Sequence, residues 1–192
     1  IFLKILKKLN KPIAAPSANI SNKVSPTSAF HVHDEFKNKI NLIIDGGSSN
    51  VGIESTVIDL TTKPKLLRAG FITQKKINAA LQMKLKKSNT INTAPGQNLL
   101  HYSPGIPVYL NRKAPKKNGA LLVFGKSRIK SNDLFYLSKK RSLIEASKKL
   151  YKLLRKIKKN GYKNISVTPI PNKDIGVAIN DRLKRSAKWK IF

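Results

Sequence analysis

The feature that most restricts the fold of this chain is a strand, helix, strand order in its C-terminal half. Residues 120–124 (ALLVF) form a continuously apolar run that ends at Gly125, which predicts a buried strand. Ser142 and Glu145 form a capping box that opens an amphipathic helix. Residues 164–168 predict a second strand. A helix that joins two strands of one sheet makes a right-handed crossover between parallel strands, so this half predicts a parallel, Rossmann-like α/β unit.

Positive charge dominates the composition, since 39 Lys and Arg residues stand against 9 Asp and Glu residues, a formal net charge of +30. Such an excess attracts nucleic acid and anionic membranes over long distances. The lysines are also spread through the chain together with many asparagines and isoleucines, as an AT-rich coding background would produce. Both explanations stay open, and charge alone names no partner.

Cysteine and long apolar runs are both absent from the sequence. A chain of 192 residues without cysteine has no disulfides, thiolate metal sites or cysteine nucleophiles. No apolar run approaches the roughly 18 residues that span a bilayer, so we expect a soluble, cytoplasmic protein without membrane contact. His31 and His33 point in different directions on a helix, so we expect them on a solvated surface and predict no metal site.

The opening segment IFLKILKKLNK predicts an amphipathic helix, with Phe2, Ile5, Leu6 and Leu9 on one face and lysines on the other. A membrane-surface helix or a targeting segment would share this pattern. The helix runs directly into Pro12 and an apolar stretch that predicts a strand, so we expect it to pack inside an α/β domain. We therefore expect the chain to start in the middle of a longer protein.

Small hydroxyl and amide residues gather between residues 12 and 27 (PIAAPSANISNKVSPT). Ser17 and Asn19 are expected at the end of the strand, because the preceding proline favours extended backbone. Ser25 before Pro26 is a natural helix N-cap, and helix N-termini bind phosphate. The alternative is that Ser17 and Asn19 are only turn formers and that Ser25 is only a cap.

Two later segments again place polar groups beside predicted strands. Residues 54–56 (EST) precede a strand, so they would lie at the edge of a sheet. Residues 65–68 form a strand that ends in Arg68, whose planar guanidinium can hold phosphate or carboxylate. The alternative is that Glu54 only bonds nearby backbone and that Ser55 fills a strand end.

Two more elements complete the predicted N-terminal half. Residues 41–45 (NLIID) predict a short apolar strand that ends at a glycine-rich loop. Thr73 is expected to cap a helix with Ile77, Ala80 and Leu81 facing inward. The polar, lysine-rich residues that follow predict a linker, in which Ala94-Pro-Gly96 and His101-Tyr-Ser-Pro104 suggest docking onto a site.

These segments, in this order, resemble the threonylcarbamoyl-AMP synthase family, whose catalytic fold is called the YrdC-like domain. The matching motifs are PIAAPSANIS with SPTSA, GIESTV, the linker motifs APG and HYSP, and AINDRL near the C-terminus. The resemblance implies an α/β fold: the C-terminal part of a YrdC-like twisted α/β domain at 1–82, and a small Rossmann-like α/β domain at 108–192. Between them, residues 83–107 would be a linker that closes over the active site.

The resemblance also implies an enzyme, a nucleotidyltransferase that joins L-threonine, bicarbonate and ATP into threonylcarbamoyl-adenylate and releases pyrophosphate. A downstream transferase would use this product to make threonylcarbamoyladenosine in tRNA, and Mg²⁺ is expected with the ATP. By the same resemblance, Ser17 and Ser55 would contact threonine, and no residue is carried over as catalytic. The predicted ATP contacts are Asn19, Ser25, Thr27, Arg68, His101 and Tyr102.

The sequence also departs from the family pattern. Asn22 stands where the family usually has glycine, and Ala69 replaces the proline after Arg68. The family's lysine-x-arginine motif belongs to a segment N-terminal to everything in this sequence, so we expect the chain alone to be inactive. Asp181 and Arg182 are expected to form a structural ion pair. The alternative function is a non-catalytic RNA-binding or remnant protein of the same fold, with tRNA or double-stranded RNA as its partner.

Overall fold

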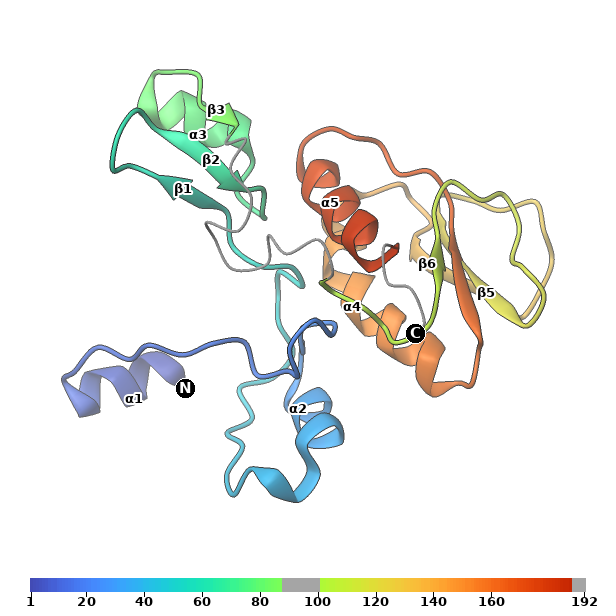
Figure 1. Cartoon of the computed structure of the whole chain (residues 1–192), viewed down its shortest axis with the longest axis horizontal. Helices are drawn as coiled ribbons and strands as arrows, with labels where there is room; N and C mark the ends of the chain where they lie inside the picture. The colour runs from blue at the N-terminus through green and yellow to red at the C-terminus, as the bar shows by residue number, and fades with distance from the viewer. Residues whose placement is uncertain (88–100, 188–192) are drawn as a thin grey trace.

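The computed structural model describes residues 1–87, the N-terminal part, and residues 101–187, the C-terminal part (Figure 1). The N-terminal part holds α1 (Phe2–Leu9), α2 (Ala29–Phe36), the 3-10 helix η1 (Lys37–Lys39), β1 (Val57–Asp59), β2 (Lys65–Arg68), α3 (Gln74–Leu81) and β3 (Lys86–Lys87). The C-terminal part holds β4 (Val108–Tyr109), β5 (Gly119–Phe124), β6 (Leu134–Ser138), α4 (Leu143–Lys159), β7 (Asn164–Val167) and α5 (Ile175–Ala187).

The C-terminal part is built on a parallel sheet with the strand order β4-β7-β5-β6. Its central strand β5 pairs with β7 on one side and β6 on the other, and all six of its residues are buried. The expected α/β class and the parallel crossover are confirmed. Strands β4 and β6 were not expected from the sequence.

Helix α4 begins as its capping box predicts, with one difference. The Glu145 N–H donates to the Ser142 hydroxyl at 3.2 Å. The Glu145 carboxylate does not return to the Ser142 N–H, because the Ser138 hydroxyl lies between them, 2.5 Å from Glu145 Oε2 and 2.9 Å from Ser142 N. The helix buries Ala146, Ser147, Leu150, Tyr151, Leu154 and Ile157, whereas Leu143 and Leu153 are only half-buried.

The N-terminal part contains a small mixed sheet in which β2 pairs antiparallel with β1 and parallel with β3. The strand ending in Arg68 and the Thr73 cap of α3 are confirmed, since the Thr73 hydroxyl accepts the Lys76 N–H. Strand β3 lies in a stretch expected to be linker. Ala80 and Leu81 are exposed instead of facing inward, so only Ile77 of that predicted face is half-buried.

Two predicted strands and one predicted cap are wrong. Residues 12–17 and 41–45 form no strand, because an extended segment needs a hydrogen-bonded neighbour and no strand in the described ranges pairs with either one. Helix α2 begins at Ala29 with Ser28 in the N-cap position. Ser25 is not a cap, since its hydroxyl donates to the Glu54 carboxylate instead.

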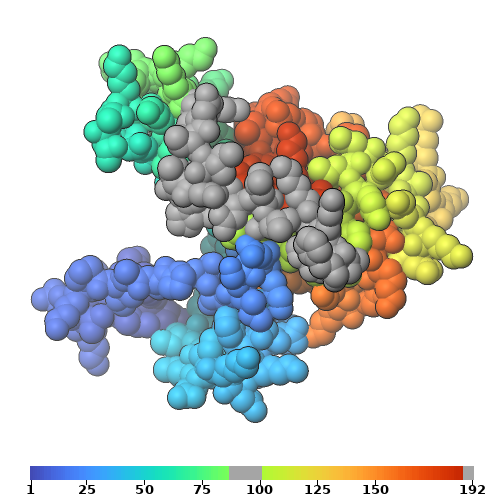
Figure 2. Space-filling view, viewed as in Figure 1, coloured from blue at the N-terminus to red at the C-terminus, as the bar shows by residue number. Residues whose placement is uncertain are grey.

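Helix α1 forms at the predicted residues but does not pack inside a domain. None of its residues is buried, and Phe2 and Leu3 are 58% and 72% exposed. Figure 2 shows α1 projecting from the rest of the surface. Among the described helices, none is long and apolar enough to cross a membrane.

The two parts share one hydrophobic core, which joins Val24, Ile53 and Tyr102 to residues of α4 and the C-terminal sheet. The Tyr102 ring stacks on Tyr151 of α4, with 5.8 Å between the ring centroids. Gly52 lets the chain approach α4 closely, because a Cβ at this position would lie 2.5 Å from the Lys148 Cα. Its positive φ of 80° also favours glycine.

Candidate functional site

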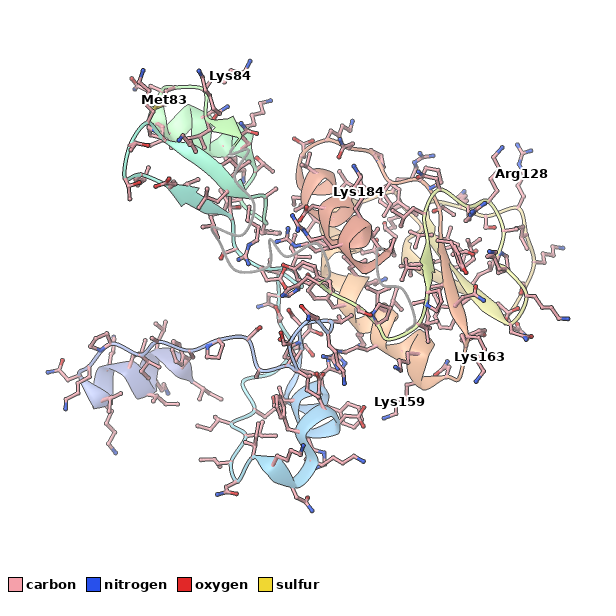
Figure 3. The ribbon with its side chains drawn as sticks, viewed as in Figure 1. Met83, Lys84, Arg128, Lys159, Lys163 and Lys184 are labelled. Atoms are coloured by element: carbon pink, nitrogen blue, oxygen red, sulfur yellow. The ribbon has the colours of Figure 1, made fainter. Side chains whose placement is uncertain are left out.

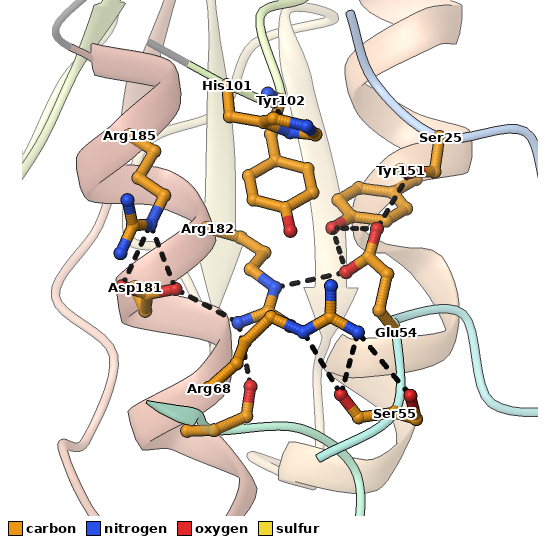
Figure 4. A network of polar contacts seen from close by, with 11 residues as sticks. Ser25, Glu54, Ser55, Arg68, His101, Tyr102, Tyr151, Asp181, Arg182 and Arg185 are labelled. Carbon is orange, nitrogen blue, oxygen red and sulfur yellow. Dashed lines mark hydrogen bonds and ion pairs between the residues drawn. The ribbon is translucent and has the colours of Figure 1, made fainter. Parts of the chain in front are cut away.

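The Glu54 carboxylate is the centre of a buried polar network where the two parts meet (Figure 4). The Ser25 hydroxyl donates to Glu54 Oε1 at 2.7 Å, and the Tyr151 hydroxyl lies 2.8 Å from Oε2. The Arg182 Nε donates to Oε2 at 3.0 Å. The alternative in which Glu54 bonds only nearby backbone is therefore wrong, since its donors come from α4, α5 and the loop before α2.

The groups of this network shift the pKa values of one another so that each keeps its usual protonation state at neutral pH. Burial alone would raise the pKa of Glu54, but the Arg182 guanidinium and the hydroxyls of Ser25 and Tyr151 outweigh it and hold this pKa below its ordinary value. Burial, together with the Glu54 carboxylate, raises the pKa of Tyr151 well above its ordinary value. At neutral pH the network therefore consists of an ionised carboxylate, a guanidinium and two protonated hydroxyls.

Arg182 ties this network to the strand that carries Arg68. Its Nη1 donates to the Ala69 carbonyl at 2.7 Å and contacts Asp181 Oδ2 at 3.0 Å. The ion pair of Asp181 and Arg182 is present, as the sequence indicated, but Arg182 makes a second one with Glu54. Sequence reasoning missed that link because it joins residues 128 positions apart, and no local pattern marks it.

Ser55, just before β1, lies beside Arg68 at the end of β2. The Arg68 guanidinium donates to the Ser55 carbonyl through Nε at 3.2 Å and Nη2 at 3.0 Å, and Nη2 lies 3.4 Å from the Ser55 hydroxyl. Arg68 also borders a cavity of about 240 Å³ between β2 and α5, whose other lining residues include Lys184 and Arg185. Three cationic side chains thus line a space that could admit a small anionic ligand, and Arg68 connects this space to the Ser55 hydroxyl.

The loop that carries Ser17 and Asn19 is held by its own backbone. The Asn19 N–H donates to the Ser17 carbonyl at 2.9 Å, and the Asn19 side-chain amide donates to the carbonyls of Ile20 and Lys23. The Asn19 Oδ1 is buried and has no partner among residues 1–87 and 101–187. Asn19 therefore offers an acceptor that the described chain does not use, while Ser17 is exposed.

Residues 101–104 dock against this same loop. The Ser103 N–H donates to the Asn22 carbonyl at 2.8 Å, and the Ser103 carbonyl accepts the Val24 N–H at 3.2 Å. Asn22, which stands where glycine was expected, has the positive φ of 66° that this position requires. The predicted motif at 94–96 lies outside the described residues.

Tyr102 and His101 bring an aromatic pair into the junction. Tyr102 is 1% exposed, and the Arg182 guanidinium lies 5.3 Å from its ring centroid. In the part of the chain that the structure describes, the buried Tyr102 hydroxyl has no hydrogen-bond partner. Burial lowers the pKa of the neighbouring His101 below 6.5, so its imidazole is neutral at pH 7.

Thr27 contacts a histidine that the sequence analysis expected on the surface. The Thr27 N–H donates to His31 Nδ1 at 3.1 Å, and the Thr27 hydroxyl lies 3.2 Å from the same nitrogen. His31 is half-buried, and this burial lowers its pKa, whereas His33 is exposed as expected. Among the described residues, no three His, Asp or Glu side chains are grouped as metal ligands.

The structure gathers most of the predicted site residues around one junction. Ser25 enters the network of Glu54, which directly precedes Ser55, and Tyr102 packs against two members of that network. Ser17, Asn19 and Thr27 lie on the loop that begins at the same junction. The resulting groups are hydroxyls, amides and guanidinium ions, which suit the positioning of a charged ligand better than nucleophilic attack.

Comparison with known proteins identifies relatives for both parts. Residues 1–70 match the family model described as Telomere recombination, and residues 72–188 match the model described as Threonylcarbamoyl-AMP synthase, C-terminal domain. A threonylcarbamoyl-AMP synthase of Pyrococcus abyssi is 35% identical over 214 aligned residues, which cover 100% of this chain and 62% of the relative. A threonylcarbamoyl-AMP synthase of Bacillus subtilis is 31% identical and is covered over 61% of its length.

A solved structure shows the same fold. The crystal structure of P. abyssi Sua5 complexed with L-threonine matches with a TM-score of 0.83 and 33% sequence identity. The match covers 96% of this chain and 60% of that one. The chain therefore spans about three fifths of the length of these relatives.

Proposed function

The chain belongs to the threonylcarbamoyl-AMP synthase family, and from this premise we propose that it works in the synthesis of threonylcarbamoyl-adenylate. The substrates are L-threonine, bicarbonate and ATP, and pyrophosphate is released. The product serves a downstream transferase that modifies tRNA. The observation that carries this proposal is the meeting of the Ser55–Arg68 pair, the Asn19 loop and the docked Tyr102 at one junction.

The proposed chemistry requires positioning more than covalent catalysis. A carbamate formed on threonine attacks the α-phosphorus of ATP, so the protein has to align two anions and stabilise the charge on phosphate. Ser17 and Ser55 hold threonine. ATP is held by Asn19, Ser25, Thr27, Arg68, His101 and Tyr102.

The observed contacts bear on these roles in different ways. Arg68 reaches the Ser55 hydroxyl at 3.4 Å, which supports a site where threonine and phosphate lie together. The Ser25 hydroxyl already donates to Glu54, so this residue acts on ATP through its oxygen lone pairs or by holding the loop. The L-threonine in the similar P. abyssi structure supports the choice of amino acid.

ATP is proposed to enter as its Mg²⁺ complex. The described carboxylate nearest to the site residues, Glu54, is already bonded to Ser25, Tyr151 and Arg182. Mg²⁺ usually keeps several waters and is held largely by substrate phosphates. The ion therefore belongs to the substrate, and the protein contributes Arg68 and the backbone of the surrounding loops.

A second candidate function is non-catalytic binding of tRNA or double-stranded RNA, and the net charge of +30 favours it. Figure 3 shows basic side chains at opposite ends of the molecule, with Lys84 near α3 and Arg128 beyond β5. This spread fits a compositional bias at least as well as one binding face. In either case the proposed location is the cytoplasm, where tRNA is modified.

Pyrophosphate release that depends on both threonine and bicarbonate tests the enzymatic proposal. The assay should use the protein with any coding sequence that precedes Ile1 included, since these 192 residues span only about three fifths of the length of their relatives. We expect Ser17→Ala and Asn19→Ala to abolish release while the circular dichroism spectrum is unchanged. Normal turnover in both variants would contradict the proposal, and tRNA binding without any turnover would favour the second candidate.

A further inference from the structure

Arg155 and Glu35 connect helix α4 to the loop that carries Asn19. The Arg155 Nη2 donates to Glu35 Oε2 at 2.6 Å and also donates to the Val24 carbonyl. The other oxygen of the same carboxylate, Oε1, accepts the Ile20 N–H at 2.7 Å. One ion pair thus holds the loop at both of its ends, immediately after Asn19 and immediately before Ser25.

This ion pair is buried, in contrast to its neighbour on the same two helices. The side chains of Glu35 and Arg155 are 5% and 18% exposed. Lys159 and Asp34 also join α4 to α2, but their distance is 3.6 Å and their side chains are 58% and 53% exposed. Because water screens an exposed pair and a buried pair much less, only the first pair can impose a definite geometry on the loop.

The position of the loop decides what Asn19 presents. The carbonyls of Ile20 and Lys23 hold the Asn19 amide nitrogen, so its buried Oδ1 is the acceptor that has no partner in the described residues. Ile20, whose N–H is held by Glu35, also supplies one of those carbonyls. A change in the Glu35 contact would therefore rotate the Asn19 amide relative to its ligand.

We infer that Arg155 and Glu35 are positioning residues for the nucleotide side of the site, so that the C-terminal part shapes a loop of the N-terminal part. The inference rests on the proposed function, in which Asn19 contacts ATP. Arg155 belongs to α4, so this helix would help to position the loop that carries Asn19. In this role each residue acts on the site through the backbone of residues 20–24.

Amide hydrogen exchange in the whole chain tests the contact itself. In Glu35→Ala, the Ile20 N–H should exchange at least about tenfold faster, since its charge-assisted hydrogen bond is lost. In Arg155→Met it should also exchange faster, since the Glu35 carboxylate loses the guanidinium that holds it in place. Glu35→Gln should fall between these variants and the natural chain, because its carbonyl oxygen can still accept the Ile20 N–H. The matched controls Asp34→Ala and Lys159→Met should leave this rate unchanged.

ATP titration of the same five variants tests the consequence. The dissociation constant for ATP should rise about tenfold in Glu35→Ala and Arg155→Met, less in Glu35→Gln, and not in the two controls. If these residues only supported the fold, the substitutions would change the free energy of unfolding but would not raise the dissociation constant for ATP in this graded order. Protection of the β5 amides in each variant shows that the C-terminal sheet is still folded.

The outcomes separate this inference from the proposed function. The inference is overturned if the exchange rate of the Ile20 N–H is unchanged in Glu35→Ala and Arg155→Met. It is also overturned if that rate rises strongly while the affinity for ATP stays the same. If the natural chain binds no ATP while the exchange results hold, the proposed function fails for this chain and the control of the loop by α4 stands.

Discussion

Replacing Arg182 by methionine should be among the most destabilising changes in this protein. Arg182 is 1% exposed, and its guanidinium bonds the Glu54 carboxylate, the Ala69 carbonyl and Asp181. Methionine has a similar length, so the packing around the stem is largely kept and the lost interactions are electrostatic. Glu54 would stay buried with only the hydroxyls of Ser25 and Tyr151 as donors.

Breaking a buried ion pair from one side costs about 3–5 kcal/mol, because the remaining charge is uncompensated. Glu54 is 18% exposed, so we expect a loss near the lower end of this range, about 3 kcal/mol. Urea unfolding followed by circular dichroism at pH 7 measures this difference. Lys149→Met, which breaks an exposed pair with Glu145, is the control and should cause no measurable change.

The pH dependence gives a second check on the same reasoning. The folded-state pKa of Glu54 is held below the ordinary glutamate value of 4.5, so its contribution to stability is present above that value and is lost as pH falls through the folded pKa. Without Arg182, burial raises the pKa of Glu54 relative to the natural chain, so the variant's carboxylate is protonated first as the pH falls. The stability difference between the natural chain and Arg182→Met should therefore be largest at neutral pH and should shrink steadily as the pH falls towards 4.5 and below. A loss under about 1 kcal/mol at pH 7, the size of a surface pair, or a loss that persists unchanged in acid would refute the argument.

Two further predictions concern the docked aromatic pair. Tyr102→Phe should leave the free energy of unfolding equal or slightly higher, because the buried hydroxyl has no partner in the described ranges, while Tyr102→Ala should cost about 3–5 kcal/mol. If Tyr102 binds ATP as proposed, Tyr102→Phe should still weaken ATP binding in a titration, and equal affinity would contradict that role. An NMR titration should give His101 a pKa below 6.5, because its ring is partly buried. The stability that neutral His101 contributes is therefore present above pH 6.5 and is lost as the pH falls through the folded-state pKa. A measured pKa of 6.5 or more would contradict the burial of the ring.

The sequence alone specified those helices and strands whose signals, such as helix caps and apolar runs, lie within the element or next to it. The apolar run at 120–124, the Ser142 cap and the Thr73 cap each act over a few residues, so β5, α4 and α3 form where they were expected. The parallel sheet followed from the same information, because a strand, helix, strand order permits few topologies. The motifs around Asn19, Ser55 and Arg68 were likewise recognisable before any coordinates.

Tertiary structure alone decided the contacts between distant residues. Residues 12–17 and 41–45 have apolar sequences typical of strands, but a strand also needs a partner, and that partner is not a property of the segment. No local pattern in the sequence assigned a partner to Arg155, and Arg182 was expected to pair with the adjacent Asp181. They pair with Glu35 and Glu54 across 120 and 128 positions. Such charges find each other only after the hydrophobic core has brought α4 and α5 against the N-terminal loops, so their pairing could not be read from spacing in the sequence.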